Sequence, residues 1–366
     1  MKVLIITPRF IYGGIEKLLL DFLKNRKNMY IEYTILLYSG VIDEGLKCQL
    51  EQQKVNLILF NSKKINNKII KRVYELYCLY NLLAKSQFDI VHIHQTDYKR
   101  MVDLGIAKLC GVKKRIMHAH GNVKKRTFFH NILRNGFDHV ATEFCACSRE
   151  AAQFLYSDSC IRNNRYVIIK NGIVVEKFIF NGKSRLEMRK RLDIEDNIVI
   201  GHVGRFTKAK NHFFMVDIFR ILANKNIKYK FILVGEGELK ESILKKCREY
   251  GIQNRVIFFG ETNEMEKILS AMDIFIFPSL HEGLGTALVE AQCNGLASVV
   301  SENIPDEAII AKNVKRISLN AGAAVWANTL ENLEIKRENN INLIKENGFN
   351  IETTVCQLEE MYEQSL

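Results

Sequence analysis

Short apolar runs rich in β-branched residues alternate with amphipathic helical patterns along the whole chain. This alternation is typical of βαβ units, in which each helix returns the chain so that the next strand pairs in parallel. The sequence therefore predicts an α/β protein. The expected strands are Lys2–Ile6, Tyr33–Tyr38, Asn56–Phe60, Asp89–His94, Arg115–His120, His139–Ala141, Phe144–Cys147, Val167–Lys170, Ile198–Val203, Lys230–Val234, Val256–Phe259, Asp273–Phe277, Ala297–Val300 and Arg316–Leu319.

The series of strands breaks near residues 178–195, where a polar turn leads into a charged helix and then a new strand. A chain of 366 residues can form two domains, because single domains are typically about 100–200 residues long. We expect two doubly wound parallel sheets, over residues 1–180 and 181–349, with a helix at about 350–366 that packs back onto the first. Ligands of such sheets bind beyond the carboxyl ends of the strands. Two such domains facing each other would share one cleft.

The positive charge of the chain is confined to its first half. Residues 1–180 contain 29 Lys and Arg against 15 Asp and Glu, whereas the remainder contains 24 basic and 26 acidic residues. Such asymmetry indicates an anionic partner for the first half, such as a membrane surface, a lipid phosphate or nucleic acid. No recognisable nucleic-acid-binding module accompanies it, so we expect no nucleic-acid partner.

Much of this charge comes in clusters, and one cluster lies in a predicted helix. The helix from Ile65 to Leu83 mixes apolar residues with Lys68, Lys71 and Arg72. A basic amphipathic helix can lie on an anionic membrane. The alternative is a helix that packs on the core and has a solvated basic edge. Further clusters are Lys63-Lys64, Lys99-Arg100, Lys113-Lys114-Arg115 and Lys124-Lys125-Arg126.

The cysteines and the apolar runs indicate the compartment. The nine cysteines are odd in number and contain no Cys-x-x-Cys pair, which favours reduced thiols over disulfides or a zinc site. No apolar run approaches the ~18 residues of a membrane-spanning helix. The first run, Lys2–Ile6, is also too short for the core of a signal peptide. We therefore expect a cytosolic protein with no metal site.

Paired glycines follow the first expected strand. Gly13 and Gly14 come just before an apolar helix. Glycines in this position let the backbone approach a ligand and direct amide groups at an anion near a helix N-terminus. The alternative is a tight strand–helix turn that binds nothing.

Two cations follow the first strand of the second half. Arg205 and Lys210 stand five residues apart in a loop that Gly204 opens. A guanidinium can hold a diphosphate in a bidentate manner and an ammonium acts as a point charge. The alternative is a solvated basic loop.

The most specific stretch combines two glutamates with a glycine-rich turn. Glu282 follows the strand 273–277, and Glu290 lies on the helix after the turn. The two carboxylates can accept hydrogen bonds from sugar hydroxyls. A phosphate can meet the amides at the start of the helix, which belong to Leu284, Gly285 and Thr286.

Other motifs carry less information. Gly235 and Gly237 follow a strand but lack the third glycine of a dinucleotide fingerprint. The phosphate-binding loop of ATPases is absent, and so is any Asp-x-Asp metal clamp. Histidines alternate at 92 and 94 and at 118 and 120, but too few ligands gather for a metal. Of these, His120 precedes a glycine at a strand end and is the best placed to face a ligand.

Together these motifs resemble the family 4 glycosyltransferases of GT-B architecture, especially those of bacterial capsules, exopolysaccharides and O-antigens. The resemblance extends over nearly the whole chain, in the order of the family's motifs. The residues that carry it are Gly13-Gly14-x-Glu16, His120, Asn171-Gly172-Ile173, Gly204-Arg205 with Lys210, Val234-Gly235-x-Gly237, Phe258-x-Gly260 and Glu282-x7-Glu290. Asn211 stands where the family often has glycine.

The resemblance implies roles for these residues. Arg205 and Lys210 would hold the donor's diphosphate, Glu282 would contact the transferred sugar, and His120 would touch that sugar near the reacting carbon. Glu290 would accept hydrogen bonds from the ribose. The remaining donor-binding residues implied are Gly13, Gly14, Gly204, Gly235, Gly237, Arg255, Leu284, Gly285 and Thr286.

The resemblance also implies the reaction. A hexose or N-acetylhexosamine would pass, with retention, from a nucleotide-diphosphate donor (UDP is expected) to a hydroxyl of a polyprenyl-diphosphate-linked or saccharide acceptor. No cofactor or metal is implied, and the enzyme would sit at the inner face of the plasma membrane. Two alternatives stay open. An epimerase of sugar nucleotides would need no acceptor, and a non-enzymatic anion-binding or membrane-binding protein would explain the charge but not the paired glutamates.

Overall fold

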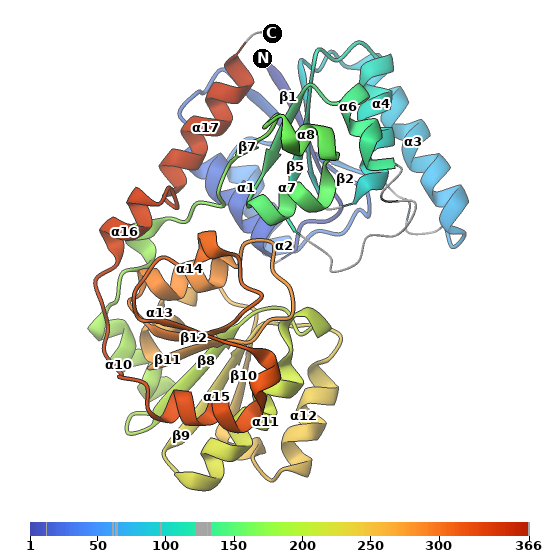
Figure 1. The fold of residues 1–366 in the computed structure, drawn as a ribbon. Helices are drawn as coiled ribbons and strands as arrows, with labels where there is room; N and C mark the ends of the chain where they lie inside the picture. The colour runs from blue at the N-terminus through green and yellow to red at the C-terminus, as the bar shows by residue number, and fades with distance from the viewer. Residues whose placement is uncertain are drawn as a thin grey trace. The chain divides into compact units, whose positions relative to one another are not determined.

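Two parallel β-sheets, one of seven strands and one of six, organise the computed structural model of the chain (Figure 1). The structure describes residues 1–11, 13–60, 62, 65–95, 97–121, 130 and 133–364. The predicted basic clusters Lys63-Lys64 and Lys124-Lys125-Arg126 lie outside these residues. The expectation of an α/β chain with two doubly wound parallel sheets is confirmed.

The first sheet has the strand order β3-β2-β1-β4-β5-β6-β7, and its neighbouring strands pair in parallel. Strand β1, which lies between β2 and β4, is buried from Val3 to Thr7. A parallel sheet covered on both faces requires such continuous apolar runs. The strands are β1 (Lys2–Thr7), β2 (Glu32–Leu37), β3 (Asn56–Leu59), β4 (Ile90–Gln95), β5 (Lys114–Ala119), β6 (Glu143–Ala146) and β7 (Val167–Ile168).

The second sheet has the order β10-β9-β8-β11-β12-β13, and it is also parallel. The strand expected over Arg316–Leu319 begins two residues earlier, as β13. The strands are β8 (Ile198–Val203), β9 (Tyr229–Val234), β10 (Val256–Gly260), β11 (Ile274–Phe277), β12 (Ala297–Ser301) and β13 (Val314–Ile317).

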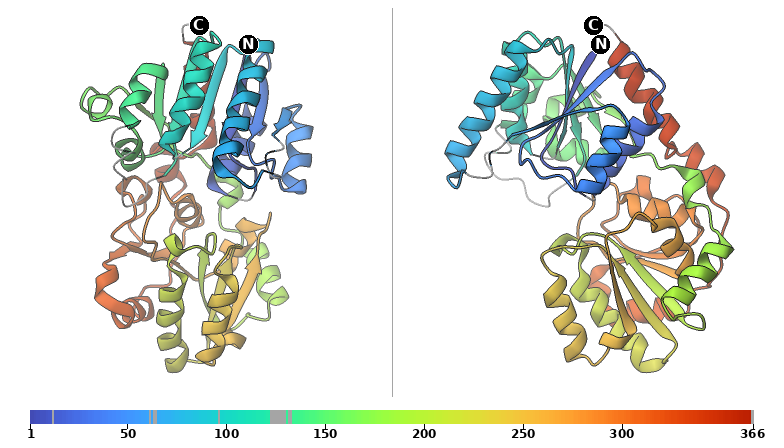
Figure 2. Two further views of the ribbon diagram at one scale, coloured as in Figure 1. Left: turned by 90° about the vertical axis from the view of Figure 1, so that its right-hand side faces the viewer. Right: turned by 180° about the vertical axis from the view of Figure 1, so that it is seen from behind.

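Helices cover both faces of each sheet (Figures 1 and 2). In the first unit α1 and α17 pack together, as do α3, α4 and α6; in the second unit α11 contacts α12 and α15. The bounds are α1 (Gly14–Asn25), α2 (Glu44–Gln52), α3 (Lys68–Lys85), α4 (Met101–Leu109), α6 (Phe137–Val140), α7 (Arg149–Leu155), α8 (Asp158–Arg162), α9 (Val175–Phe178), α10 (Gly182–Arg191), α11 (His212–Lys225), α12 (Lys240–Glu249), α13 (Met265–Ala271), α14 (Thr286–Cys293), α15 (Gly322–Glu331), α16 (Ile341–Glu346) and α17 (Ile351–Glu363).

One expected strand is wrong. Residues His139–Ala141 do not join the sheet, because Phe137–Val140 forms the short helix α6 and Ala141 ends it. Only Thr142 separates this segment from the strand that does form, β6. Neighbouring parallel strands need a crossover of a dozen or more residues, so the two segments could not both pair in parallel.

The chain divides into two compact units at positions that differ from the sequence-based boundaries. The first unit contains Met1–Gly172 and Ile351–Leu366, and the second contains Ile173–Asn350. The short helix α9, placed in the first domain by sequence, packs on α13, α14 and α16 of the second unit. The side-chain amide of Asn294 fixes its end by donating to the Phe178 carbonyl at 2.9 Å.

The C-terminal helix α17 belongs to the first unit. A carboxylate oxygen of Glu359 accepts from the backbone amides of Lys27 and Asn28 at 2.9 and 3.0 Å. The Lys114 ammonium donates to the Met361 carbonyl at the other side of the helix. The buried Tyr362 ring lies edge-on to Phe22, with their centroids 6.4 Å apart. These contacts fix α17 beside α1.

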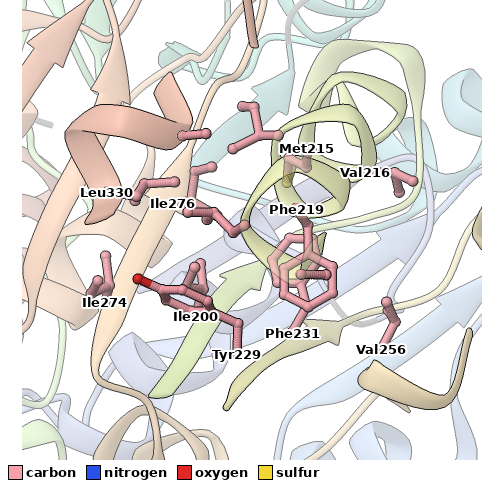
Figure 3. Close-up of a cluster of buried hydrophobic side chains, with 14 of the residues drawn as sticks. Ile200, Met215, Val216, Phe219, Tyr229, Phe231, Val256, Ile274, Ile276 and Leu330 are labelled. Atoms are coloured by element: carbon pink, nitrogen blue, oxygen red, sulfur yellow. The ribbon is translucent and has the colours of Figure 1, made fainter. Parts of the chain in front are cut away.

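The core of the second unit forms between its sheet and helices α11 and α15 (Figure 3). Phe219 of α11 stacks on Phe231 of β9 with ring centroids 5.0 Å apart. Trp326 of α15 is fully buried, and its indole nitrogen donates to the Ser318 carbonyl at 3.0 Å. This packing holds the strands whose carboxyl ends carry the candidate site.

The cysteines and helix lengths bear on two further expectations. All nine cysteines lie among the described residues, and none of them forms a disulfide. Burial raises the pKa of the Cys293 thiol to about 12 and that of Cys247 to about 11, which keeps both thiols protonated at neutral pH. Within the described part of the chain, we find no helix with the length and apolar character that a membrane crossing requires.

Candidate active site

The loops after β8 and β11 meet at the point where the strand order of the second sheet reverses. Strands β8 and β11 are neighbours, whereas the chain leads from β8 outward to β9 and β10 and from β11 outward to β12 and β13. Ligands of doubly wound sheets bind at such a point, outside the carboxyl ends of the strands. The loop after β8 carries Gly204, Arg205 and Lys210, and the loop after β11 carries Glu282.

Lys210 and Glu282 form an ion pair that joins these two loops. The Lys210 ammonium lies 2.6 Å from a carboxylate oxygen of Glu282, and 4.9 Å from the centroid of the Phe277 ring. Glu282 is buried and Lys210 is half-buried. The backbone reinforces the contact, because the Leu280 amide donates to the Ala209 carbonyl at 2.7 Å. The structure thus brings together the cation and the acid that sequence analysis placed in separate motifs.

Asn211 shapes the turn that presents Lys210. Its backbone is in the left-handed region, at φ 59° and ψ 41°, between the short 3₁₀ turn Lys208–Lys210 and α11. Its side-chain amide donates to the Pro278 carbonyl at 3.2 Å. Asparagine is one of the few residues besides glycine that adopt this conformation readily. The replacement of the family's usual glycine by Asn211 therefore preserves the turn.

Glycines let the loop after β9 press against the loop that carries Arg205. Gly235 has φ +134°, and a Cβ there would lie 2.4 Å from the carbonyl oxygen of Gly204. A Cβ on Gly237 would lie 2.5 Å from the carbonyl oxygen of Phe206. Backbone hydrogen bonds lock the contact, from Gly204 to Val234 at 3.0 Å and from Phe206 to Glu236 at 2.8 Å. These glycines hold the backbone on either side of Arg205 in place.

The start of helix α14 lies at the same edge of the sheet. Gly285 is the residue before the helix and has φ +86°. It has no side chain to occupy the first amides of α14, and such amides are donors that favour an anion. Leu284 is buried just before the turn, and Glu290 is buried in the second turn of the helix. Thr286 opens the helix.

The structure does not bring Arg255 together with these residues. Arg255 ends the 3₁₀ turn Gln253–Arg255 and precedes β10, so it lies at the amino end of the strand. Its guanidinium donates to the carbonyl of Ala223 in α11. At ~3.3 Å per residue, the five-residue strand β10 separates it from the carboxyl edge by about 16 Å. Gly260, at the other end of β10, bridges Gly235 instead.

Two histidines that sequence analysis missed lie beside Lys210. A ring nitrogen of His202 is 2.9 Å from the Ile276 carbonyl, and its ring lies perpendicular to His212 with centroids 5.0 Å apart. Burial, assisted by the positive charge of Lys210, lowers the pKa of His212 to about 3, and burial likewise lowers that of His202. Both rings are therefore neutral at pH 7. The signal was present, since His202 interrupts the apolar strand directly before Val203-Gly204.

The first unit gathers its predicted residues at the carboxyl edge of its own sheet. The strand order reverses between β1 and β4. Gly13 precedes helix α1 and its carbonyl accepts from the Lys17 amide at 3.0 Å, while Gly14 is the first helical residue. His120 directly follows β5, the neighbour of β4. Gly13, Gly14 and His120 thus share one edge of this sheet.

His120 belongs to a stack of four buried histidines, with His92, His94 and His118. A ring nitrogen of His94 is 2.8 Å from one of His120, and the rings of His118 and His120 stack with centroids 4.0 Å apart. His92 contacts the Tyr362 hydroxyl at 2.7 Å. The structure brings nitrogens of His92, His94 and His118 within 4.8 Å of one another, which sequence counting did not anticipate.

The geometry of this stack favours packing and hydrogen bonding over a metal centre. The rings of His92 and His118 are parallel to within 4°. An imidazole ligates through a lone pair in the plane of its ring. Lone pairs of parallel stacked rings run side by side, so these two rings would have to turn before they could converge on one ion.

The buried histidines make both units sensitive to acid. Burial lowers the pKa of His120 to about 3, as it does for His212. Because these folded pKa values lie below the unfolded value of about 6.5, the unfolded chain binds more protons, and stability falls as pH drops from about 6.5 toward 3. We expect each of the two to cost about 2 kcal/mol of unfolding free energy at pH 5. Urea unfolding at pH 7.5 and 5.0 measures this, and equal free energies at the two values would contradict it.

Comparison with known proteins adds to this geometry. Residues 184–348 match the family described as Glycosyl transferases group 1. CapH of Staphylococcus aureus, a capsular polysaccharide biosynthesis glycosyltransferase, is 28% identical over 371 residues, which cover 99% of this chain and 98% of CapH. EpsF of Bacillus subtilis (strain 168), also named as a glycosyltransferase, is 33% identical over 251 residues, 66% of this chain and 65% of EpsF. The chain belongs to the group 1 glycosyltransferases.

Two further proteins are similar to this glycosyltransferase. An Escherichia coli enzyme named UDP-Gal:alpha-D-GlcNAc-diphosphoundecaprenol alpha-1,3-galactosyltransferase is 27% identical over 315 residues, 81% of each chain. The solved structure of Anabaena HepE with UDP and glucose aligns with a TM-score of 0.82 over 100% of both chains, at 19% identity. The HepE match establishes the shared GT-B fold. The predicted glycosyltransferase activity is confirmed, and the epimerase and non-enzymatic alternatives are set aside.

Proposed function

We propose that this glycosyltransferase moves a sugar from a UDP-sugar to a hydroxyl of a saccharide carried on undecaprenyl diphosphate, during synthesis of a bacterial surface polysaccharide. The names of the Escherichia coli galactosyltransferase and of CapH support this donor, acceptor and process. HepE, which shares the fold, was solved with UDP-glucose. The observation that carries the proposal is the Lys210–Glu282 pair at the switch point of the second sheet.

Arg205 and Lys210 would stabilise the departing diphosphate. In the reaction the bond between the anomeric carbon and the phosphate oxygen breaks, and its electron pair stays on the phosphate. The acceptor oxygen bonds to the same face of the anomeric carbon, and its proton passes to that phosphate oxygen. Fixed cations and helix-start amides aimed at the developing charge lower the barrier without reorganising. Lys210 has three N–H donors, so it can keep Glu282 while it contacts phosphate.

The two buried glutamates would orient the donor. Glu282, held in place by Lys210, would accept hydrogen bonds from hydroxyls of the transferred sugar. Glu290, in the second turn of α14, would accept hydrogen bonds from the ribose. Charged acceptors make stronger hydrogen bonds than neutral ones, and a site built to bind a hydroxyl rejects a ligand that lacks it. These two carboxylates therefore belong to the specificity of the donor site.

The first unit would supply the acceptor side. Gly13 and Gly14 lie before α1, and His120 lies at the same edge of the sheet. His94 orients the His120 ring through the 2.8 Å contact between their nitrogens. A neutral His120, with its lowered pKa, would present a hydrogen-bonding or apolar surface to a sugar without adding charge.

A screen of nucleotide sugars tests the donor. UDP-sugars at about a hundred times their dissociation constant should raise the unfolding temperature of the second unit by about 7 °C, because binding adds about 2.7 kcal/mol to its unfolding free energy. GDP- and ADP-sugars at the same concentration serve as matched controls. Equal shifts with all three nucleotides, or no shift with any UDP-sugar, would contradict the proposal. Retention is checked by the anomeric configuration of the product in an NMR spectrum.

A further inference from the structure

The outward face of helix α3 carries a row of exposed apolar side chains. Ile69 is 76% exposed, Val73 62% and Tyr77 64%. They are four residues apart, which places them one above another on the same face of a helix. Further exposed residues widen the row, namely Ile70, Tyr74 and Tyr80. Large apolar side chains scattered singly on a surface need no explanation, but a contiguous set indicates an interaction site.

The opposite face of α3 is fixed to the first unit. Leu79 and Leu83 are buried. Glu75 accepts from the Ser62 hydroxyl at 3.1 Å, and Arg72 pairs with Asp103 of α4 at 2.6 Å. Figures 1 and 2 show α3 on the outside of its unit beside α4. Because the inner face is occupied, the outer apolar row cannot be buried by turning the helix.

The charged side chains that α3 exposes to solvent are all positive. Lys71, which is half-buried, and Lys85, which is exposed, border the apolar row. Lys68 is exposed at the first turn but shares the helix side of Glu75, seven residues later, and Glu75, the single acidic residue of α3, faces inward. The first 180 residues as a whole contain 29 basic and 15 acidic residues. The outer face of α3 therefore combines apolar side chains with positive charge and lacks a carboxylate.

We infer that the outer face of α3 binds the surface of an anionic phospholipid bilayer. An amphipathic helix with lysines beside its apolar face lies in the plane of the headgroups and buries the apolar side chains at the acyl boundary. Three of the six apolar residues are tyrosines, the residue type that settles at that interface. The inference deepens the proposed function, on which it rests for the lipid-linked acceptor: it assigns the surface that brings the enzyme to that acceptor.

The alternative binding partner for an apolar helix face is a second copy of the chain. A two-fold interface would place the same surface of both copies together. Lys71 and Lys85 of one copy would then lie near those of the other, with no carboxylate on the face to compensate them. Repulsion between these like charges opposes the pairing of two copies, whereas anionic lipid headgroups neutralise the positive charge. The charge on this face therefore favours lipid.

Vesicle flotation tests the inference. The wild type should float with vesicles of 30% phosphatidylglycerol at low salt and remain unbound with pure phosphatidylcholine. The triple variant Ile69→Ser, Val73→Ser, Tyr77→Ser should lower the partition coefficient about tenfold or more, since three side chains no longer enter the boundary. A matched triple variant in the second unit, Leu186→Ser, Ile227→Ser, Val325→Ser, changes residues that are 70%, 75% and 48% exposed and should bind as the wild type does.

Two more variants test separately the contribution of the lysines to vesicle binding and the insertion of the apolar side chains into the bilayer. Lys71→Gln with Lys85→Gln should weaken binding by about fivefold per lysine, unlike Lys183→Gln with Lys190→Gln in α10. Tyr77→Trp adds a reporter to a chain whose single tryptophan, Trp326, is buried in the other unit. Its emission should shift to the blue and be quenched by brominated acyl chains. No shift with anionic vesicles would overturn the inference.

The outcomes distinguish this inference from the proposed function. Vesicle binding needs no donor, so its absence in an enzyme that still transfers sugar to a water-soluble acceptor would overturn only the membrane surface. Binding without transfer would overturn only the proposed reaction. Gel filtration decides on the alternative occupant: a wild-type dimer that the α3 triple variant converts to a monomer, without vesicle binding, would assign this face to a second copy.

Discussion

Replacing Lys210 by alanine should reduce glycosyl transfer by about 10²–10³-fold, the cost of losing one preorganised charge at a transition state. Lys210 is the half-buried cation whose ammonium is 2.6 Å from Glu282 at the switch point of the second sheet. Without it, the charge on the departing diphosphate is left to Arg205 and the start of α14. The measurement is kcat and KM with a saturating UDP-sugar, and the loss should fall mainly on kcat, because the negative charge grows as the bond breaks.

Controls separate this role from a structural one. Lys225→Ala removes a lysine that pairs with Glu331 in the same unit, and it should leave the rate unchanged. Lys210→Ala also leaves Glu282 buried without its cation, which can destabilise the fold. Adding Glu282→Gln removes that unpaired charge, so the double variant should recover thermal stability but not activity. Full recovery of the rate in the double variant would show that Lys210 serves only to neutralise Glu282.

Replacing Gly235 by alanine should reduce transfer by about 10²-fold although residue 235 itself carries no reacting group. A Cβ at this position would lie 2.4 Å from the Gly204 carbonyl oxygen, and φ +134° disfavours any side chain. The loop that carries Arg205 must then move, and a displacement near 1 Å from the reacting geometry costs about that factor. Steady-state kinetics and donor titration by calorimetry measure the effect. The affinity for UDP should fall as well.

The matched control is Gly182→Ala in α10. A Cβ there meets nothing within 4 Å, and Gly182 is the first residue of α10, outside the loops that carry the candidate site. It should keep both activity and stability. If Gly235→Ala transferred sugar at the wild-type rate, the close approach of the two loops would not matter for Arg205, and the assignment of that residue to the diphosphate would lose its structural support.

Much of the fold could be predicted because the strands are buried on both faces. Continuous apolar runs such as Val3–Ile6 and Phe275–Phe277 identify strands of a covered parallel sheet without alignment or coordinates. The strand predicted at His139–Ala141 is wrong because the same signal is ambiguous: a short apolar run packs equally well as a buried helical turn. Arg255 was assigned to the donor through the family resemblance, as part of the strand near Arg255–Gly260. Only the structure shows that it precedes β10 and lies at the amino end of that strand.

The sequence by itself determined the order of strands and helices, the glycines that close contacts demand and the motif with paired glutamates. Only the tertiary structure decided that Lys210 meets Glu282, 72 residues away, because that contact follows from β8 and β11 being neighbours in the sheet. It also decided which stripe of α3 is covered. Both stripes are apolar, so helical periodicity alone does not show which of them packs on the core. The Glu75–Ser62 and Arg72–Asp103 contacts fix one stripe against the first unit. The other stripe, with Ile69, Val73 and Tyr77, therefore faces solvent.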